Sequence, residues 1–113
     1  MVGSQSTINE LADRVEKMLP DMMGRKNAMH TRNISARLGL DIAKSDRQVR
    51  KVMKTLLIER GLPVISTRKG FFLARNKQEL KEYMWSLEEH VKGMRQTYDA
   101  VGKCLDNEFL FSS

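Results

Sequence analysis

The sequence predicts one small α+β domain that is mainly helical, with a β-hairpin placed before a long C-terminal helix. First, apolar residues recur at helical spacing in four segments between residues 7 and 105. Second, a short stretch rich in β-branched and aromatic residues, residues 62–73, is interrupted by the turn sequence Arg68-Lys69-Gly70. Third, 113 residues with 41% hydrophobic and 30% charged side chains have the size and composition of a single globular domain.

The first helix is expected over Thr7–Leu19. Thr7 followed by Glu10 forms a capping box, in which side chains satisfy the free backbone N–H groups of a helix start. Pro20 should end this helix, because its ring and missing N–H are incompatible with a helix interior. One face of the segment is apolar and should contact the core: Ile8, Leu11, Ala12, Val15, Met18 and Leu19.

A short strand and a second helix should follow. Ala28–His30 is compatible with a strand, and the hydroxyl of Thr31 can cap the helix that comes next. Ile34 and Leu38 give this helix apolar contacts. Gly39 should end it, since glycine suits the left-handed backbone at a helix C-terminus.

After a turn, a third helix is expected between Ser45 and Gly61. Ser45 with Gln48 forms another capping box. The apolar residues share one face of the helix: Val49, Val52, Met53, Leu56 and Leu57. The two segments together predict a helix, a turn and a helix.

The hairpin is expected to pair Leu62–Thr67 with Phe71–Leu73, with Pro63 at the start of its first strand, where proline is tolerated. Asn76 with Glu79 makes a third capping box, which opens a helix that continues to about Leu105. The expected domain organisation is a disordered N-terminus at 1–6, a globular domain at 7–75, the long helix at 76–106 and a tail at 107–113.

Positive charge gathers in the middle of the chain. The formal net charge is +6 and the pI is near 9.7, which favours a polyanionic partner without proving one. Residues 21–75 hold 13 Lys or Arg against 4 acids, a net of +9, and leave 7 basic and 10 acidic residues in the flanks. The excess therefore belongs to the segments that form the helix, turn, helix and hairpin.

The third helix places its cations on the side opposite its apolar face. On a wheel of about 100° per residue, the four share one side: Arg47, Arg50, Lys51 and Lys54. No acid lies between Arg47 and Lys54, whereas ordinary solvated faces mix signs. A helix fits the major groove, where Arg and Lys bond guanine and Gln bonds adenine. The sequence thus predicts a double-stranded DNA contact: Arg47, Gln48 and Arg50 on bases, Lys51 and Lys54 on phosphates, and Ser45 beside a phosphate at the helix N-terminus.

Arg68 and Lys69 place two further cations at the hairpin tip, beside Gly70. A glycine turn of this kind can approach a DNA backbone or minor groove. An ordinary solvent-exposed turn is the alternative. Its position after a basic helix favours a DNA contact.

Three segments resemble the winged helix-turn-helix domains of the biotin-repressor type: Ile34–Gly39, Val49–Leu56 and Gly61–Leu73. Through its long last helix the chain is also similar to small bacteriophage and prophage winged-helix proteins. The resemblance covers about residues 31–105. It implies that Ser45–Arg60 is the recognition helix, that Arg68–Gly70 lies at the wing, and that the chain binds DNA.

The last helix carries a row of apolar residues spaced alternately by four and three positions, a heptad seam: Leu80, Met84, Leu87, Val91, Met94, Tyr98, Val101 and Leu105. Such a row predicts a homodimer through the long helix. The alternative is that the helix packs on its own domain. Phe109-Leu110-Phe111 in the tail is either a frayed end or an apolar hook for this or another protein.

Enzymatic signatures are missing from the sequence: it has no phosphate-binding glycine loop, no nucleophile beside a base and no acidic cluster. Cys104 is the only cysteine, and His30 and His90 lack ligand spacing, so neither a metal site nor a cofactor is expected. No apolar run approaches the roughly 20 residues that span a bilayer, and no signal peptide is seen, so a soluble, cytoplasmic protein is expected.

The leading hypothesis is therefore sequence-selective DNA binding by a dimer, in transcription control or in the replication or recombination of a mobile element. The alternative is an adaptor that binds a host protein through the long helix and apolar tail. RNA binding is disfavoured, because few aromatic residues accompany the basic segments.

Overall fold

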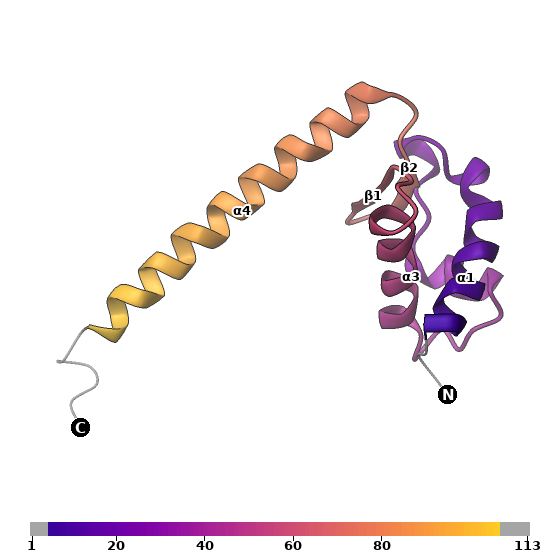
Figure 1. Ribbon diagram of the computed structural model, residues 1–113, viewed down its shortest axis with the longest axis horizontal. Coiled ribbons are helices and arrows are strands. Elements are labelled where there is room, and N and C mark those ends of the chain that lie inside the picture. Colours follow the sequence, from indigo (N-terminus) through magenta and orange to yellow (C-terminus); the bar gives the residue numbers. More distant parts are fainter. Residues whose placement is uncertain (1–4, 107–113) are drawn as a thin grey trace. The chain divides into compact units, whose positions relative to one another are not determined.

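The computed structural model describes residues 5–106 and confirms the mainly helical fold with one hairpin and a long last helix (Figure 1). Contacts within the chain divide it into two units, one up to Leu80 and one from Lys81 onward. In chain order the elements are α1 (Gln5–Met18), the 3-10 turns η1 (Leu19–Met22) and η2 (Arg25–Asn27), α2 (Thr31–Arg37), α3 (Asp46–Ile58), β1 (Val64–Thr67), β2 (Gly70–Leu73) and α4 (Lys77–Leu105).

The first unit has one hydrophobic core, built from α1, α2, α3, the η1 turn and the hairpin. α1 and α3 lie side by side (Figure 1), and their apolar faces meet in this core. The largest fully buried side chains include Phe72, Ile8, Met22, Ile34 and Met53. Full burial of one such side chain stabilises the folded state by about 1.5–3 kcal/mol. Because its apolar face is packed in this core, α3 has a fixed position from which its opposite face is exposed.

The hairpin pairs β1 with β2 in antiparallel register, from Val64 opposite Leu73 to Thr67 opposite Gly70. The strand expected at Ala28–His30 is reduced to one bridge, in which the Met29 N–H donates to the Phe71 carbonyl at 2.8 Å and the Phe71 N–H donates back at 2.9 Å. Gly70 has φ +123°, and a Cβ there would collide with the Met29 backbone. Glycine is therefore required where the hairpin meets this segment.

Two of the expected helix starts differ in the structure. α1 begins at Gln5, so Thr7 lies inside the helix and is not its cap, and residues 5 and 6 belong to the helix. Residues 1–4 and the tail 107–113 lie outside the described part. α2 is capped by His30, whose Nδ1 accepts the Arg32 N–H at 3.2 Å, while Thr31 is the first helical residue. The hydroxyl of Thr31 has a different partner, described below.

Two other helix ends match their prediction more closely. Asn76 caps α4, because its Oδ1 accepts the Glu79 N–H at 3.0 Å, but the Glu79 carboxylate returns to the Arg75 N–H at 2.6 Å instead of to Asn76. At the end of α2, Gly39 has φ +70°, and the Leu40 N–H donates to the Ser35 carbonyl at 3.0 Å. This is the Schellman ending that glycine permits.

Candidate nucleic-acid interface

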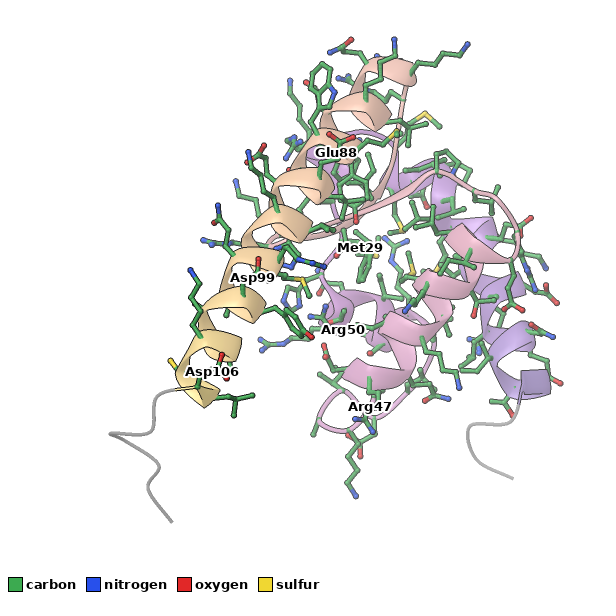
Figure 2. The ribbon with its side chains drawn as sticks, turned by 60° about the vertical axis from the view of Figure 1, so that its left-hand side comes forward. Met29, Arg47, Arg50, Glu88, Asp99 and Asp106 are labelled. Atoms are coloured by element: carbon green, nitrogen blue, oxygen red, sulfur yellow. The ribbon has the colours of Figure 1, made fainter. Side chains whose placement is uncertain are left out.

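α3 buries one face and exposes another. Its core face consists of Val49, Val52, Met53 and Leu56, all buried, and Thr55 is buried beside them. Leu57, which the sequence assigns to this face, is 39% exposed, so the buried stripe is narrower than expected. The opposite face carries exposed cations, as predicted: Arg47, Arg50, Lys51 and Lys54. Arg47 lies at the N-terminal end of the helix (Figure 2).

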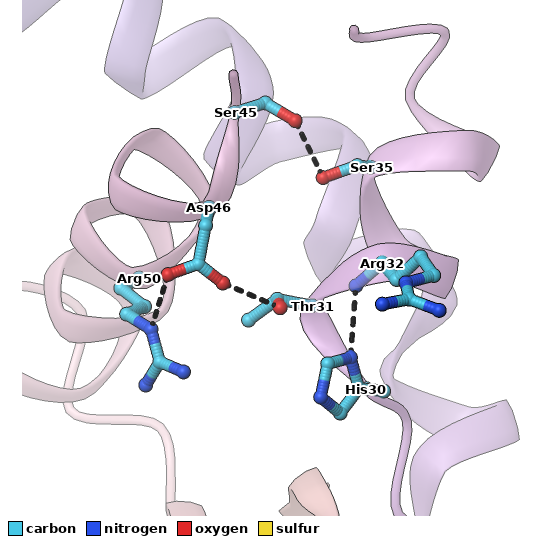
Figure 3. Close-up of polar contacts among 7 residues, drawn as sticks. All are labelled: His30, Thr31, Arg32, Ser35, Ser45, Asp46 and Arg50. Carbon is cyan, nitrogen blue, oxygen red and sulfur yellow. Dashed lines mark hydrogen bonds and ion pairs between the residues drawn. The ribbon is translucent and has the colours of Figure 1, made fainter. Parts of the chain in front are cut away.

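Asp46, the first residue of α3, connects this helix to α2. Its Oδ1 accepts a hydrogen bond from the Thr31 hydroxyl at 2.7 Å, and its Oδ2 pairs with Arg50 Nε at 2.8 Å (Figure 3). Two hydrogen bonds lower the pKa of Asp46 below its ordinary value of 3.8. The bond from Thr31 has the larger effect and the bond from Arg50 the next. Arg50 is thus the one cation of the predicted set with a carboxylate partner within the described residues.

Ser45 has a structural role that the sequence interpretation missed. Its side chain makes no capping bond to α3, so the predicted capping box with Gln48 is wrong. The residue is only 4% exposed, and its hydroxyl donates to the Ser35 hydroxyl at 2.7 Å (Figure 3). Because this buried pair joins the end of the turn to α2, the Ser45 side chain is withdrawn from the candidate phosphate contacts.

The other cations of α3 are unpaired within residues 5–106. Arg47, Lys51 and Lys54 are exposed and form no ion pair there, and Gln48 is half-buried between them. Arg60, just beyond α3, is the opposite case: its guanidinium pairs with Asp13 at 2.8 Å and Glu16 at 3.1 Å. Arg60 therefore links the end of α3 to α1, whereas Arg47, Lys51 and Lys54 keep no ion-pair partner among the described residues.

The hairpin tip is an ordered two-residue turn. The Thr67 hydroxyl donates to the Gly70 carbonyl at 2.9 Å and accepts the Lys69 N–H at 3.2 Å. Arg68 and Lys69 are exposed and make no ion pair with any described residue. The turn therefore presents two cations from a fixed backbone.

Arg32 and Lys44 are two further exposed cations that the sequence interpretation did not select. Arg32 lies in the first turn of α2 and Lys44 in the connection before α3, and neither has a carboxylate partner in the described chain. Arg32 also lines a shallow hollow with His30, Thr31 and Asp46. The high positive charge of residues 21–75 was the available signal, but only the fold places α2 against the start of α3.

α4 exposes its apolar row. Leu80 is half-buried, and the exposed fractions of the other seven lie between 44% and 78%: Met84, Leu87, Val91, Met94, Tyr98, Val101 and Leu105. No residue described in α4 is buried. Glu88 and Asp99 (labelled in Figure 2) belong to the mixed-charge remainder of the helix.

Over residues 5–106, no cluster of three or more His, Cys, Asp or Glu side chains could hold a metal ion. His30 serves as the α2 cap, and Cys104 is an exposed free thiol. In the same part of the chain, no helix combines the length and apolar character needed to cross a membrane.

The chain matches no protein-family model, no curated protein and no solved structure. Only the architecture of the chain therefore indicates which class of protein it resembles. Helices followed by a two-stranded hairpin and a long helix form an arrangement compatible with a winged helix-turn-helix protein.

Proposed function

We propose that the protein binds double-stranded DNA as a winged helix-turn-helix protein, with α3 as the recognition helix and the β1–β2 turn as the wing. The observation that supports this most strongly is the exposed face of α3. Arg47, Lys51 and Lys54 lie there without a carboxylate partner among the described residues, on a helix whose other face is in the core. A rigid helix with unpaired cations suits insertion into a polyanionic groove.

The contacts divide by chemistry. Arg47, Gln48 and Arg50 are the candidates for base edges, and the hydrogen bond that Arg50 Nε donates to Asp46 gives its guanidinium a defined direction. Lys51 and Lys54 contact phosphates. On the wing, Arg68 and Lys69 contact the backbone or minor groove.

Arg32, in the first turn of α2, is a further candidate for a phosphate contact. Its exposed guanidinium lines the hollow at the start of α3. The resemblance to small phage and prophage winged-helix proteins favours a role in transcription control, or in replication or recombination of a mobile element. For such a role we expect a cytoplasmic protein with neither enzymatic activity nor a cofactor.

A matched pair of triple variants tests the proposal. Arg47→Ala with Lys51→Ala and Lys54→Ala should reduce affinity for a selected duplex at least about 100-fold, because three charge-assisted contacts are lost. The control removes three exposed cations elsewhere: Arg14, Lys17 and Lys26. It keeps the same net charge as the test variant. Equal affinity of the two folded variants for DNA, measured by fluorescence anisotropy, would disprove the recognition-helix assignment.

The exposed apolar row of α4 supports a second candidate, an adaptor that binds another protein. The two functions differ in their salt dependence. DNA binding through unpaired cations should weaken steeply as salt rises, whereas an apolar protein interface should not. A protein indifferent to every duplex in a random pool, but stably bound to a partner through α4, would favour the adaptor.

A further inference from the structure

The apolar row of α4 runs along most of the length of the helix, and its side chains are exposed to solvent. Leu87, Val91 and Met94 at its centre are 44%, 63% and 59% exposed. A sustained heptad row of this kind is ordinarily buried against another helix. No described residue of α4 is buried, so the helix taken by itself leaves this row uncovered.

The row has the same spacing in both directions along the helix. Its steps are four, three, four, three, four, three and four residues, so a reversed copy matches it over its whole length. An antiparallel partner would form four kinds of layer: Leu80 with Leu105, Met84 with Val101, Leu87 with Tyr98, and Val91 with Met94. Large side chains then face smaller ones in most layers, whereas a parallel pair would stack Tyr98 on Tyr98.

The charged residues beside the row distinguish the two orientations. Glu88 and Arg95 lie on one flank, where they line a shallow hollow with Leu87 and Val91. The opposite flank carries His90 and Thr97, which line a hollow with Met94 and Tyr98. In the antiparallel register Glu88 faces Arg95 of the second copy, and this occurs twice in the pair. In a parallel pair Glu88 would face Tyr83 and Arg95 would face His90, so no opposite charges would meet.

We propose that α4 pairs with α4 of a second copy in an antiparallel coiled coil, with two Glu88–Arg95 ion pairs across the interface. Arg95 is free to exchange partners, because its contact with Asp99 is 3.6 Å long and both side chains are more than half exposed. The inference rests on α4 alone and is independent of the proposed DNA binding.

The orientation has a geometric consequence. At about 1.5 Å per residue, the two Leu80 positions of an antiparallel pair lie roughly 38 Å apart along the coiled coil. The two chains therefore enter it from opposite ends. A parallel pair would bring the same two positions together.

Charge exchange tests the pairing. Glu88→Arg alone, or Arg95→Glu alone, places like charges opposite each other twice and should weaken self-association about tenfold. A mixture of the two variants restores both ion pairs in the heterodimer, which should form more tightly than either homodimer. Glu89→Arg, on the outward side of the helix, is the matched control and should have no effect. Sedimentation and native mass spectrometry measure all four samples, and no gain on mixing overturns the antiparallel arrangement.

Cys104 provides an independent measurement, because it is the only cysteine of the chain and is exposed. Spin labels on its two copies should lie roughly 35 Å apart or more in the antiparallel pair. A parallel pair would place them within about 20 Å of each other, as expected for adjacent helix axes plus the label arms. A short distance overturns the orientation, and a monomer at tens of micromolar overturns the second copy itself.

Discussion

α3 and α4 are both amphipathic, but they place their apolar faces in opposite environments. Val52 of α3 is completely buried, whereas Val91 of α4 is 63% exposed. The charged faces differ too: α3 has one acid, Asp46, while α4 mixes both signs along its length. The same kind of periodicity thus produces one helix whose apolar face is buried in a core and whose cations are exposed, and another helix whose apolar residues are themselves exposed.

The comparison predicts the largest effect for a charge placed in each valine position. Val52→Asp should destabilise the first unit by at least about 3 kcal/mol, since an unpaired carboxylate would be buried. Val91→Asp should leave the thermal midpoint of that unit nearly unchanged and instead prevent self-association. Thermal unfolding followed by circular dichroism, together with sedimentation, separates the two outcomes. Equal destabilisation of the first unit by both changes would contradict the comparison.

The next effect concerns the centre of the α4 row. Leu87→Glu with Met94→Glu should give monomers, because four carboxylates would be forced into one apolar contact. Binding to a duplex with two half-sites should weaken far more than binding to one half-site, since the linkage between the two domains is lost. Glu82→Gln with Glu89→Gln is a control on the solvent side. An equal loss on both duplexes would show that α4 does not link two DNA-binding units.

A smaller effect is expected at the wing. Arg68→Ala with Lys69→Ala should weaken binding to all duplexes by a similar factor and reduce the slope of log affinity against log salt by about one to two units. Affinity measured at several salt concentrations on two unrelated duplexes provides the readout. A change of preference at particular base pairs would instead assign base reading to the wing.

Much of the fold follows from local patterns in the sequence. Apolar periodicity locates the four α-helices but not the 3-10 turns η1 and η2, the turn residues locate the hairpin, and Gly39 marks the end of α2 with its positive φ. The cationic face of α3 is equally local, because its residues lie within one short segment. These features are predictable since each depends on neighbours along the chain.

What the sequence does not show is where a hydroxyl finds its partner. Ser45 and Thr31 both have capping residue types, yet Ser45 bonds Ser35 and Thr31 bonds Asp46, which lies 15 residues away. Those choices depend on how α2 packs against α3. The four-residue spacing of Asp46 and Arg50 allows their ion pair, but the acid lies just before the acid-free stretch from Arg47 to Lys54 that predicts the cationic face.

The smallest predicted effect lies at this Asp46 junction. Because its bonds to Thr31 and Arg50 lower the pKa of Asp46 below 3.8, the carboxylate stabilises the fold above that pH. The contribution should disappear as the pH falls through the lower folded-state pKa.

Asp46→Asn should therefore reduce the thermal midpoint modestly near neutral pH and flatten its decline below about pH 4. Glu10→Gln on the exposed face of α1 is the control for simple loss of a carboxylate. If the Asp46→Asn variant loses stability on acidification as steeply as the control, the Thr31–Asp46–Arg50 contacts do not stabilise the junction. A second readout is the DNA affinity of the Asp46→Asn variant. If this affinity falls, and the Arg68→Ala with Lys69→Ala variant keeps its sequence preference, the direction that Asp46 gives to Arg50 matters for base reading by α3.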